Sequence, residues 1–268
     1  MTWLQAVILG LVEGITEFLP VSSTGHLLVA ERMMGLPDGE ASKAYAICIQ
    51  AGAILAVGVL YTHRLKQTAL GMIGRNPEGR RLLERILVAF APAVVAGLLL
   101  DKHVEAVLFG AWPVVIAWVV GGVAILVFGR DLRLTGADLG ALSNKHAFLI
   151  GLAQCVAMWP GTSRSLATIA GGLLVGLSLP AAVEFSFLLG FITLSAATAF
   201  SALKHADEMF AAYGAAPLLI GFVVAFVSAV VAVRGMVAFL ERGGFALFGV
   251  WRIAAGAIVA GLLLAGRI

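Results

Sequence analysis

Two acidic residues interrupt the first hydrophobic stretch of the sequence. Glu13 and Glu17 are four residues apart, so on a helix they share one face. A carboxylate in an apolar segment is costly and is rarely kept without a role. Two neighbouring carboxylates also repel each other unless a proton or a cation lies between them. The pair therefore suits a general base, a pair of ligands for a divalent metal, or a proton site; a polar contact between helices is the structural alternative.

A run of hydroxyl residues and a histidine follows directly after Pro20. Ser22, Ser23 and Thr24 are residue types that commonly begin helices, which alone would explain them. A helix that begins here, however, points its free N–H groups toward the break, where they can bind an anion. His26, about one turn into that helix, is placed to transfer protons or to attack phosphorus. We therefore predict an anion site at this break.

A second polar tip, with the sequence PGTSRS, occupies residues 160–165. Arg164 is always charged and binds phosphate oxygens through two parallel hydrogen bonds, although an internal ion pair with the glutamates of the first tip would also explain it. If the two tips meet, their side chains form a phosphate site inside the membrane. The residues predicted to bind that phosphate are Ser22, Thr24, Ser163, Arg164, Ser165 and Thr168.

Five further polar residues lie within apolar segments. Gln50, Gln154 and Glu184 occupy comparable places in or after the two polar segments, and we predict that they line the cavity. Arg234 and Arg252 lie near the ends of hydrophobic segments, where long basic side chains usually extend to the membrane surface. We predict no catalytic role for these two arginines.

The composition identifies lipid as the solvent of most of the chain. Of the 268 residues, 61% are hydrophobic and only 12% are charged, whereas a soluble domain carries about 25% charged residues. The net charge of +3 is typical of basic cytoplasmic loops rather than of nucleic-acid binding. The two cysteines lie in apolar runs and predict neither a disulfide framework nor a metal cluster.

The hydrophobic segments predict an all-α polytopic membrane protein with six transmembrane helices and two re-entrant hairpins. The hairpins, at residues 4–35 and 146–177, are each broken near a proline into halves too short to span a bilayer comfortably. Six other segments are long enough to span, at residues 44–62, 82–100, 112–129, 181–201, 216–239 and 246–266.

The two halves of the chain resemble each other. Gly10 matches Gly151, Glu13 matches Gln154, and a one-residue gap near the proline then matches Ser23 with Ser163. We therefore predict a single membrane domain, 1–268, made of repeats at 1–130 and 131–268, each a hairpin followed by three spans. Because three spans is an odd number, the second repeat is inverted, and such repeats place the site at the midplane of the membrane.

The loop charges predict the orientation. Nine Lys or Arg residues fall in the loops at 63–81, 130–145 and 240–245, against four in the opposite loops and termini. The positive-inside rule then places the nine in the cytoplasm and both termini outside. The first hairpin enters from outside and the second from the cytoplasm, so their tips can meet.

Two long motifs carry a family resemblance. ExxxE followed by FLPVSSTGHL, and later PGTSRSxxT, resemble the undecaprenyl-diphosphate phosphatases of the bacitracin-resistance type. NPEGRRLL, APAVVAGLL, EFSFLLG and FxxWRIxxG extend the resemblance over nearly the whole chain. Departures include Leu166 at a common glycine position, Phe191-Ile192-Thr193 where a proline is frequent, and Trp251 at a common tyrosine position. None of them removes a proposed catalytic side chain, although Leu166 could alter the second tip.

The resemblance implies an integral enzyme of the bacterial inner membrane. Such an enzyme hydrolyses undecaprenyl diphosphate to undecaprenyl phosphate and inorganic phosphate, which recycles the lipid carrier for cell-wall synthesis and confers bacitracin resistance. It implies a divalent cation, Mg²⁺ or Ca²⁺, near Glu13 and Glu17, a site open to the periplasm, and a polyprenyl diphosphate lipid as substrate; a homodimer is one assembly it could form. Carried onto this sequence, the catalytic residues are Glu13, Glu17, Ser23, His26 and Arg164.

Two questions stay open at the level of sequence. Ser23, His26 or water could attack the phosphorus. Inverted repeats with paired hairpins also build transporters, so a transporter or flippase of a lipid phosphate or another anion is the alternative function. A carrier needs no nucleophile, so release of inorganic phosphate separates the two functions.

Overall fold

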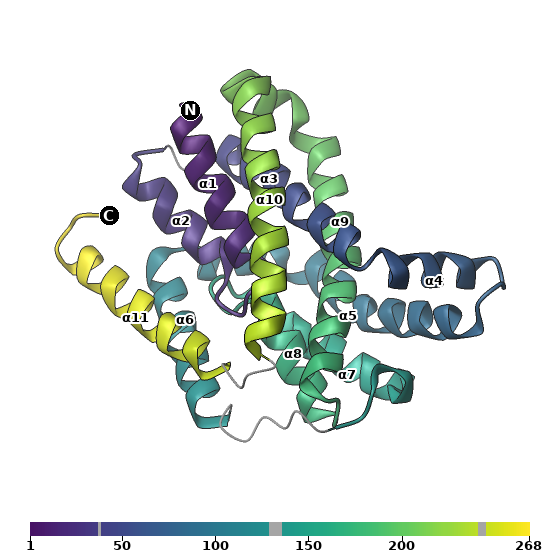
Figure 1. Cartoon of the computed structure of the whole chain (residues 1–268). Helices are drawn as coiled ribbons and strands as arrows, with labels where there is room; N and C mark the ends of the chain where they lie inside the picture. Colours follow the sequence, from purple (N-terminus) through teal and green to yellow (C-terminus); the bar gives the residue numbers. More distant parts are fainter. Residues whose placement is uncertain (37–38, 129–135, 241–244) are drawn as a thin grey trace.

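The computed structural model of the chain describes residues 1–36, 39–128, 136–240 and 245–268, and these residues fold into helices (Figure 1). Two short 3₁₀ turns, η2 (Leu139–Ala141) and η3 (Val156–Met158), precede and follow α7. The α-helices are α1 (Trp3–Thr16), α2 (Ser23–Met33), α3 (Glu40–Leu60), α4 (Thr62–Met72), α5 (Pro77–Leu108), α6 (Ala111–Phe128), α7 (Asn144–Cys155), α8 (Arg164–Leu174), α9 (Leu179–Tyr213), α10 (Ala215–Leu240) and α11 (Phe245–Leu264).

Five of these helices are long and apolar enough to cross a membrane. They include residues 41–60, 77–100, 179–204, 215–240 and 245–264. The segment predicted at 112–129 forms α6, whose apolar part at residues 111–127 is shorter than the other five. The chain is therefore a multi-pass membrane protein, and a sixth span stays a prediction.

Both predicted hairpins form two helices joined by a tight reversal. The first consists of α1 and α2, and the second of α7, η3 and α8. Directly before α2 and α8 stand Ser22 and Ser163, whose φ angles are +74° and +76°. These are the two described residues other than glycine with positive φ, a conformation that costs about 1–3 kcal/mol in a residue with a Cβ. The two tips therefore share one strained backbone conformation.

The shared conformation corrects the predicted alignment of the two halves. Ser22, not Ser23, takes the same backbone position as Ser163. The one-residue gap is then unnecessary, because Glu13 and Gln154 stand the same distance before these serines. The predicted alignment matched Pro20 with Pro160, but Pro20 stands two residues before Ser22 and Pro160 stands three residues before Ser163. Ser23 consequently matches Arg164.

Each hairpin packs against a long helix from the other half of the chain. α1 lies against α10, and α7 lies against α5. Close approach requires glycine at both contacts: a Cβ on Gly10 would lie 2.6 Å from the carbonyl oxygen of Gly221, and one on Gly151 would lie 2.3 Å from that of Ala89. α3 also packs on α9, and α6 packs on α11. α3, α9 and the two tips lie toward the centre of the molecule (Figure 1).

The region predicted as a loop at 63–81 is instead mostly helical. α4 packs alongside the start of α5, and the pair projects to one side of the molecule (Figure 1). Arg64 on α4 forms an ion pair with Glu184 on α9, with 2.5 Å between Nε and Oε1. Glu184 was predicted to line the cavity, and this is wrong because the salt bridge holds its side chain at α4.

Candidate active site

A polar cavity of about 270 Å³ lies where the two hairpin tips meet. Its wall also includes residues of α3, α5 and α9, among them Ala93 and Thr193. Eight of the side chains singled out in the sequence line it: Glu17, Ser22, Ser23, Thr24, Gln50, Gln154, Ser163 and Arg164.

Glu17 stands at the centre of the polar contacts. Its Oε2 accepts a hydrogen bond from the Ser23 hydroxyl at 2.5 Å, and its Oε1 accepts one from Nη2 of Arg164 at 3.2 Å. Nε2 of Gln50 donates to the same Oε2 from 3.5 Å. One carboxylate therefore connects a hydroxyl of the first tip with the guanidinium of the second. A carboxylate so placed can take a proton from the hydroxyl.

Arg164 is fixed on three sides. Its Nη1 donates to the carbonyl oxygen of Ser186 at 3.0 Å, and its guanidinium carbon lies 5.2 Å from the ring centroid of Phe18. A Cβ on Gly190 would lie 2.1 Å from Nη1, so only glycine leaves room for the guanidinium here. Nε is buried without a hydrogen-bond partner. The guanidinium is thus rigidly held with donor capacity remaining for a phosphate.

The first turns of α2 and α8 face the cavity. Ser22, Ser23 and Thr24 line it at the start of α2, and Ser163 and Arg164 line it at the start of α8, with Ser22 and Ser163 directly before the helices. The first N–H groups of a helix have no partners within that helix, and they carry partial positive charge. Two such turns beside one guanidinium are an arrangement that favours an anion.

Ser165 and Thr168, both predicted to bind the phosphate, lie behind the cavity wall. The Ser165 hydroxyl donates to the carbonyl oxygen of Leu19 at 2.9 Å, which ties the second tip to the first. The Thr168 hydroxyl lies 2.6 Å from that of Ser186 and 2.9 Å from the carbonyl oxygen of Arg164. Neither side chain is among the residues that line the cavity. Both therefore support the residues that do.

His26 also lies outside the cavity lining. Nδ1 is 2.7 Å from the carbonyl oxygen of Ser22, and Nε2 is 3.0 Å from the indole nitrogen of Trp251. Because an indole N–H only donates, these contacts assign the proton to Nδ1. The ring packs against Trp118 and Trp251, with centroids 4.6 Å and 6.1 Å away. Both ring nitrogens are thus occupied, and one of them holds the turn at Ser22.

Two matching positions on the hairpins carry buried polar atoms without partners. Glu13 is 1% exposed and its Oε1 has no hydrogen bond, although its carboxylate interacts with that of Glu17. Gln154 is 3% exposed, lines the cavity, and has no partner for either atom of its amide. An unpaired buried polar group costs about 1–3 kcal/mol. Such groups beside a polar cavity are sites that a bound molecule would satisfy.

Arg252 was predicted to extend to the membrane surface, and this prediction is wrong. Its side chain is 0% exposed, and its guanidinium donates to backbone carbonyl oxygens of both hairpin tips and of α6. Arg234, by contrast, is exposed, and its extension to the membrane surface stays a prediction. Arg252 lies about two turns inside α11. That depth was the one signal in the sequence that its charge could not easily reach the surface.

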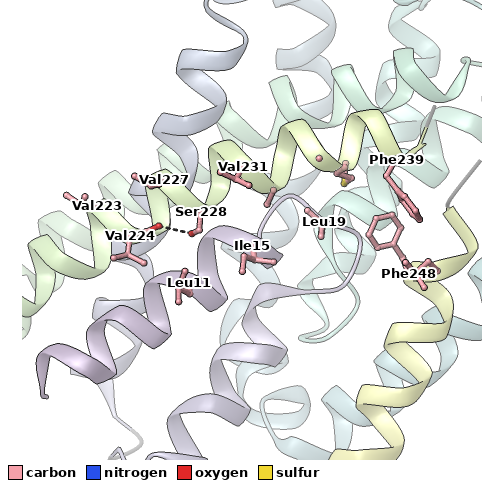
Figure 2. Close-up of a pocket in the computed structure, with 14 residues that line it drawn as sticks. Leu11, Ile15, Leu19, Val223, Val224, Val227, Ser228, Val231, Phe239 and Phe248 are labelled. Carbon is pink, nitrogen blue, oxygen red and sulfur yellow. Dashed lines mark hydrogen bonds between the residues drawn. The ribbon is translucent and has the colours of Figure 1, made fainter. Parts of the chain in front are cut away.

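A second cavity, of about 810 Å³, lies between α1, α10 and α11 (Figure 2). Its walls are almost wholly apolar, and the labelled Ser228 uses its hydroxyl within α10, where it donates to the carbonyl oxygen of Val224 at 2.7 Å. Leu11, Ile15 and Val227 of this wall are exposed on the protein surface. None of the predicted site residues is among those that line it.

Fold and site together define a class: a multi-pass helical membrane protein with a cavity at its hairpin tips that is lined by a carboxylate, a hydroxyl and a guanidinium. The comparisons make this class specific. The model of the family described as Bacitracin resistance protein BacA matches residues 6–258, and the chain belongs to this family.

Curated relatives that match nearly the whole chain carry one consistent name. The chain is 46% identical to undecaprenyl-diphosphatase 1 of Chromobacterium violaceum, over 98% of this chain and 97% of that protein. It is 45% identical to the undecaprenyl-diphosphatase of Sorangium cellulosum, over 97% and 86% of the two chains. It is 44% identical to the undecaprenyl-diphosphatase of Nitrobacter winogradskyi, over 98% of each chain.

Proposed function

We propose that the protein hydrolyses undecaprenyl diphosphate to undecaprenyl phosphate and inorganic phosphate. The observation that carries this proposal is the Glu17 carboxylate, which contacts both the Ser23 hydroxyl and the Arg164 guanidinium in one cavity. The family and its relatives named undecaprenyl-diphosphatase supply the substrate. The reaction recycles the lipid carrier of cell-wall synthesis. Because it removes the diphosphate lipid that bacitracin binds, it also confers resistance to that antibiotic.

The contacts support a two-step mechanism with Ser23 as nucleophile. Glu17 takes the Ser23 proton as the serine oxygen bonds to the terminal phosphorus, and the bond from that phosphorus to the bridging oxygen breaks. Undecaprenyl phosphate leaves with that oxygen. Water then attacks the phosphoserine, the bond from phosphorus to the serine oxygen breaks, Glu17 returns its proton to that oxygen, and inorganic phosphate leaves. Arg164 and the amides of the two tips hold the charge on the terminal phosphate throughout.

A divalent cation, Mg²⁺ or Ca²⁺, is part of this proposal. Glu13 and Glu17 are the residues that would hold it, and the buried, unpartnered Oε1 of Glu13 fits a cation ligand. Across the described residues no group of three or more His, Cys, Asp or Glu side chains gathers, so substrate oxygens would complete the coordination. When bound, such a cation neutralises charge on the phosphate oxygens.

We also propose the membrane arrangement predicted from the sequence. The matching turns at Ser22 and Ser163, and the reciprocal packing of α1 on α10 and α7 on α5, support an inverted repeat of hairpin plus three spans. The loop charges support cytoplasmic basic loops. The site would then open to the periplasmic side of the bacterial inner membrane.

The test is release of inorganic phosphate from undecaprenyl diphosphate by purified protein in detergent, with and without a chelator. The wild type should release phosphate, the chelator should stop it, and Glu17→Gln should lower kcat by at least about 100-fold. Glu184→Gln is the matched control, because its carboxylate pairs with Arg64 outside the cavity. Binding of the lipid without phosphate release would overturn the hydrolase and favour a carrier, and activity in the chelator would overturn the cation.

A further inference from the structure

Arg252 holds the two hairpin tips together from behind the cavity. Nη1 donates to the carbonyl oxygens of Pro20 and Thr162, at 3.3 Å and 3.1 Å. Nη2 donates to those of Gly161 and Ala117, at 2.9 Å and 2.8 Å. One guanidinium thus joins the first tip, the second tip and α6. A Cβ on Gly121 of α6 would lie 2.3 Å from Nη2, so only glycine at this position leaves room for the guanidinium.

Two of the four carbonyls that Arg252 binds, those of Pro20 and Gly161, occupy equivalent places in the two hairpins. Pro20 stands two residues before Ser22, and Gly161 stands two residues before Ser163, the two serines with positive φ. The residues that directly follow these serines are Ser23 and Arg164. Arg252 therefore contacts both turns at the same place, close to the nucleophile of one tip and to the phosphate-binding guanidinium of the other.

The charge of Arg252 also bears on the anion site. In the described part of the chain no carboxylate pairs with Arg252, and its guanidinium donates to backbone carbonyls alone. A buried cation without a counterion is costly. If Arg252 only had to hydrogen-bond the carbonyls of the two tips, a neutral donor would be enough. Arg252 does not line the cavity, but Gly161 does. The guanidinium thus partly neutralises the negative ends of tip carbonyls beside the cavity.

We propose that Arg252 is a positioning residue for phosphoryl transfer, an inference that rests on the proposed function. It holds the two strained turns in register so that Ser23 and Arg164 face one phosphate. Misplacement of reacting groups by about 1 Å lowers rates by about 100-fold, so the main effect of losing this clamp falls on kcat.

The test compares Arg252→Met and Arg252→Lys with the wild type, as kcat and KM for phosphate release per mole of monodisperse protein. Arg252→Met removes every donor and should lower kcat by about 100-fold. Arg252→Lys keeps the charge and some of the carbonyl contacts, and it should recover about tenfold of that loss, with KM near the wild-type value in both. Arg234→Met, on the exposed face of α10, is the matched control and should behave as the wild type.

Unchanged kcat in the folded Arg252 variants would overturn the inference. A merely structural role would lower the yield of monodisperse protein but leave kcat of the folded fraction unchanged. If Arg252→Met is not recovered folded, Arg252→Lys decides alone: a kcat near the wild-type value is contrary to the inference, and a loss of about tenfold supports it. A wild type that releases no phosphate overturns the proposed function and this inference together, whereas an active wild type with equally active Arg252 variants overturns only this inference.

Discussion

Ser23 donates a 2.5 Å hydrogen bond to Glu17 across the break of the first hairpin. Glu17 directly follows α1, and Ser23 is the first residue of α2, so the broken helix brings the acid and the hydroxyl face to face. An unbroken helix would not, because residues six apart lie on different faces. The break is therefore what creates the pair of groups that the proposed reaction needs.

Replacing Ser23 with alanine should lower phosphate release by at least about 100-fold, because the nucleophile is lost while Glu17 and Arg164 remain. In the wild type, acid quenching during turnover of substrate labelled in the terminal phosphate should leave label on Ser23, since phosphoserine survives acid. Ser42→Ala is the control, because that hydroxyl bonds Glu31 away from the cavity. Label that is lost in acid or found on His26 would contradict this assignment.

Arg164→Lys should lower kcat/KM by about 10- to 100-fold, and Arg164→Ala should abolish measurable release. A lysine ammonium cannot reach the Ser186 carbonyl, Glu17 and a phosphate in the geometry of the planar guanidinium. The matched control is Arg64→Lys, which changes an ion pair outside the cavity. Near-normal turnover by Arg164→Ala would show that Arg164 does not bind the terminal phosphate.

His26 gives a different prediction, because its ring lies beside the cavity and holds the Ser22 carbonyl through Nδ1. His26→Ala should lower kcat, and His26→Asn should recover a large part of the loss, since an asparagine amide can donate to the same carbonyl. A histidine that transfers protons could not be replaced in this way. Equal inactivity of the two variants in the phosphate-release assay would therefore restore His26 as a catalyst.

Local sequence signals predicted the hairpins and the centre of the site. Proline breaks and intramembrane polar residues are visible in the sequence, and they identified Glu17, Ser23 and Arg164, which the fold brings together. The same signals did not separate the side chains that face the cavity from those that support it. Thr168 carries a suitable hydroxyl one turn from Arg164. That hydroxyl contacts Ser186 of α9, so it lies behind the cavity wall and not in the cavity.

The errors in prediction arose where a distant contact decides the environment of a charge. Arg252 reads as an interfacial arginine in a hydropathy pattern, and only the approach of both tips and α6 supplies the carbonyls that let it be buried. Glu184 reads as a cavity residue, and its partner Arg64 lies on a helix, α4, that was predicted as a loop. Neither partner is near in sequence, so no local pattern could indicate it.

Gln154→Met should separate stability from activity. The amide of Gln154 is buried without a partner, so replacing it with an apolar side chain of similar shape removes an unsatisfied group of about 1–3 kcal/mol, and the Tm of the substrate-free protein should stay equal or rise. If the amide binds the diphosphate or the water that attacks it, kcat/KM should fall about tenfold in the same variant. Gln67→Met on α4 is the control, since its amide oxygen contacts Arg64 outside the cavity. A lower Tm with unchanged kcat/KM would mean that the Gln154 amide serves the fold and not the substrate.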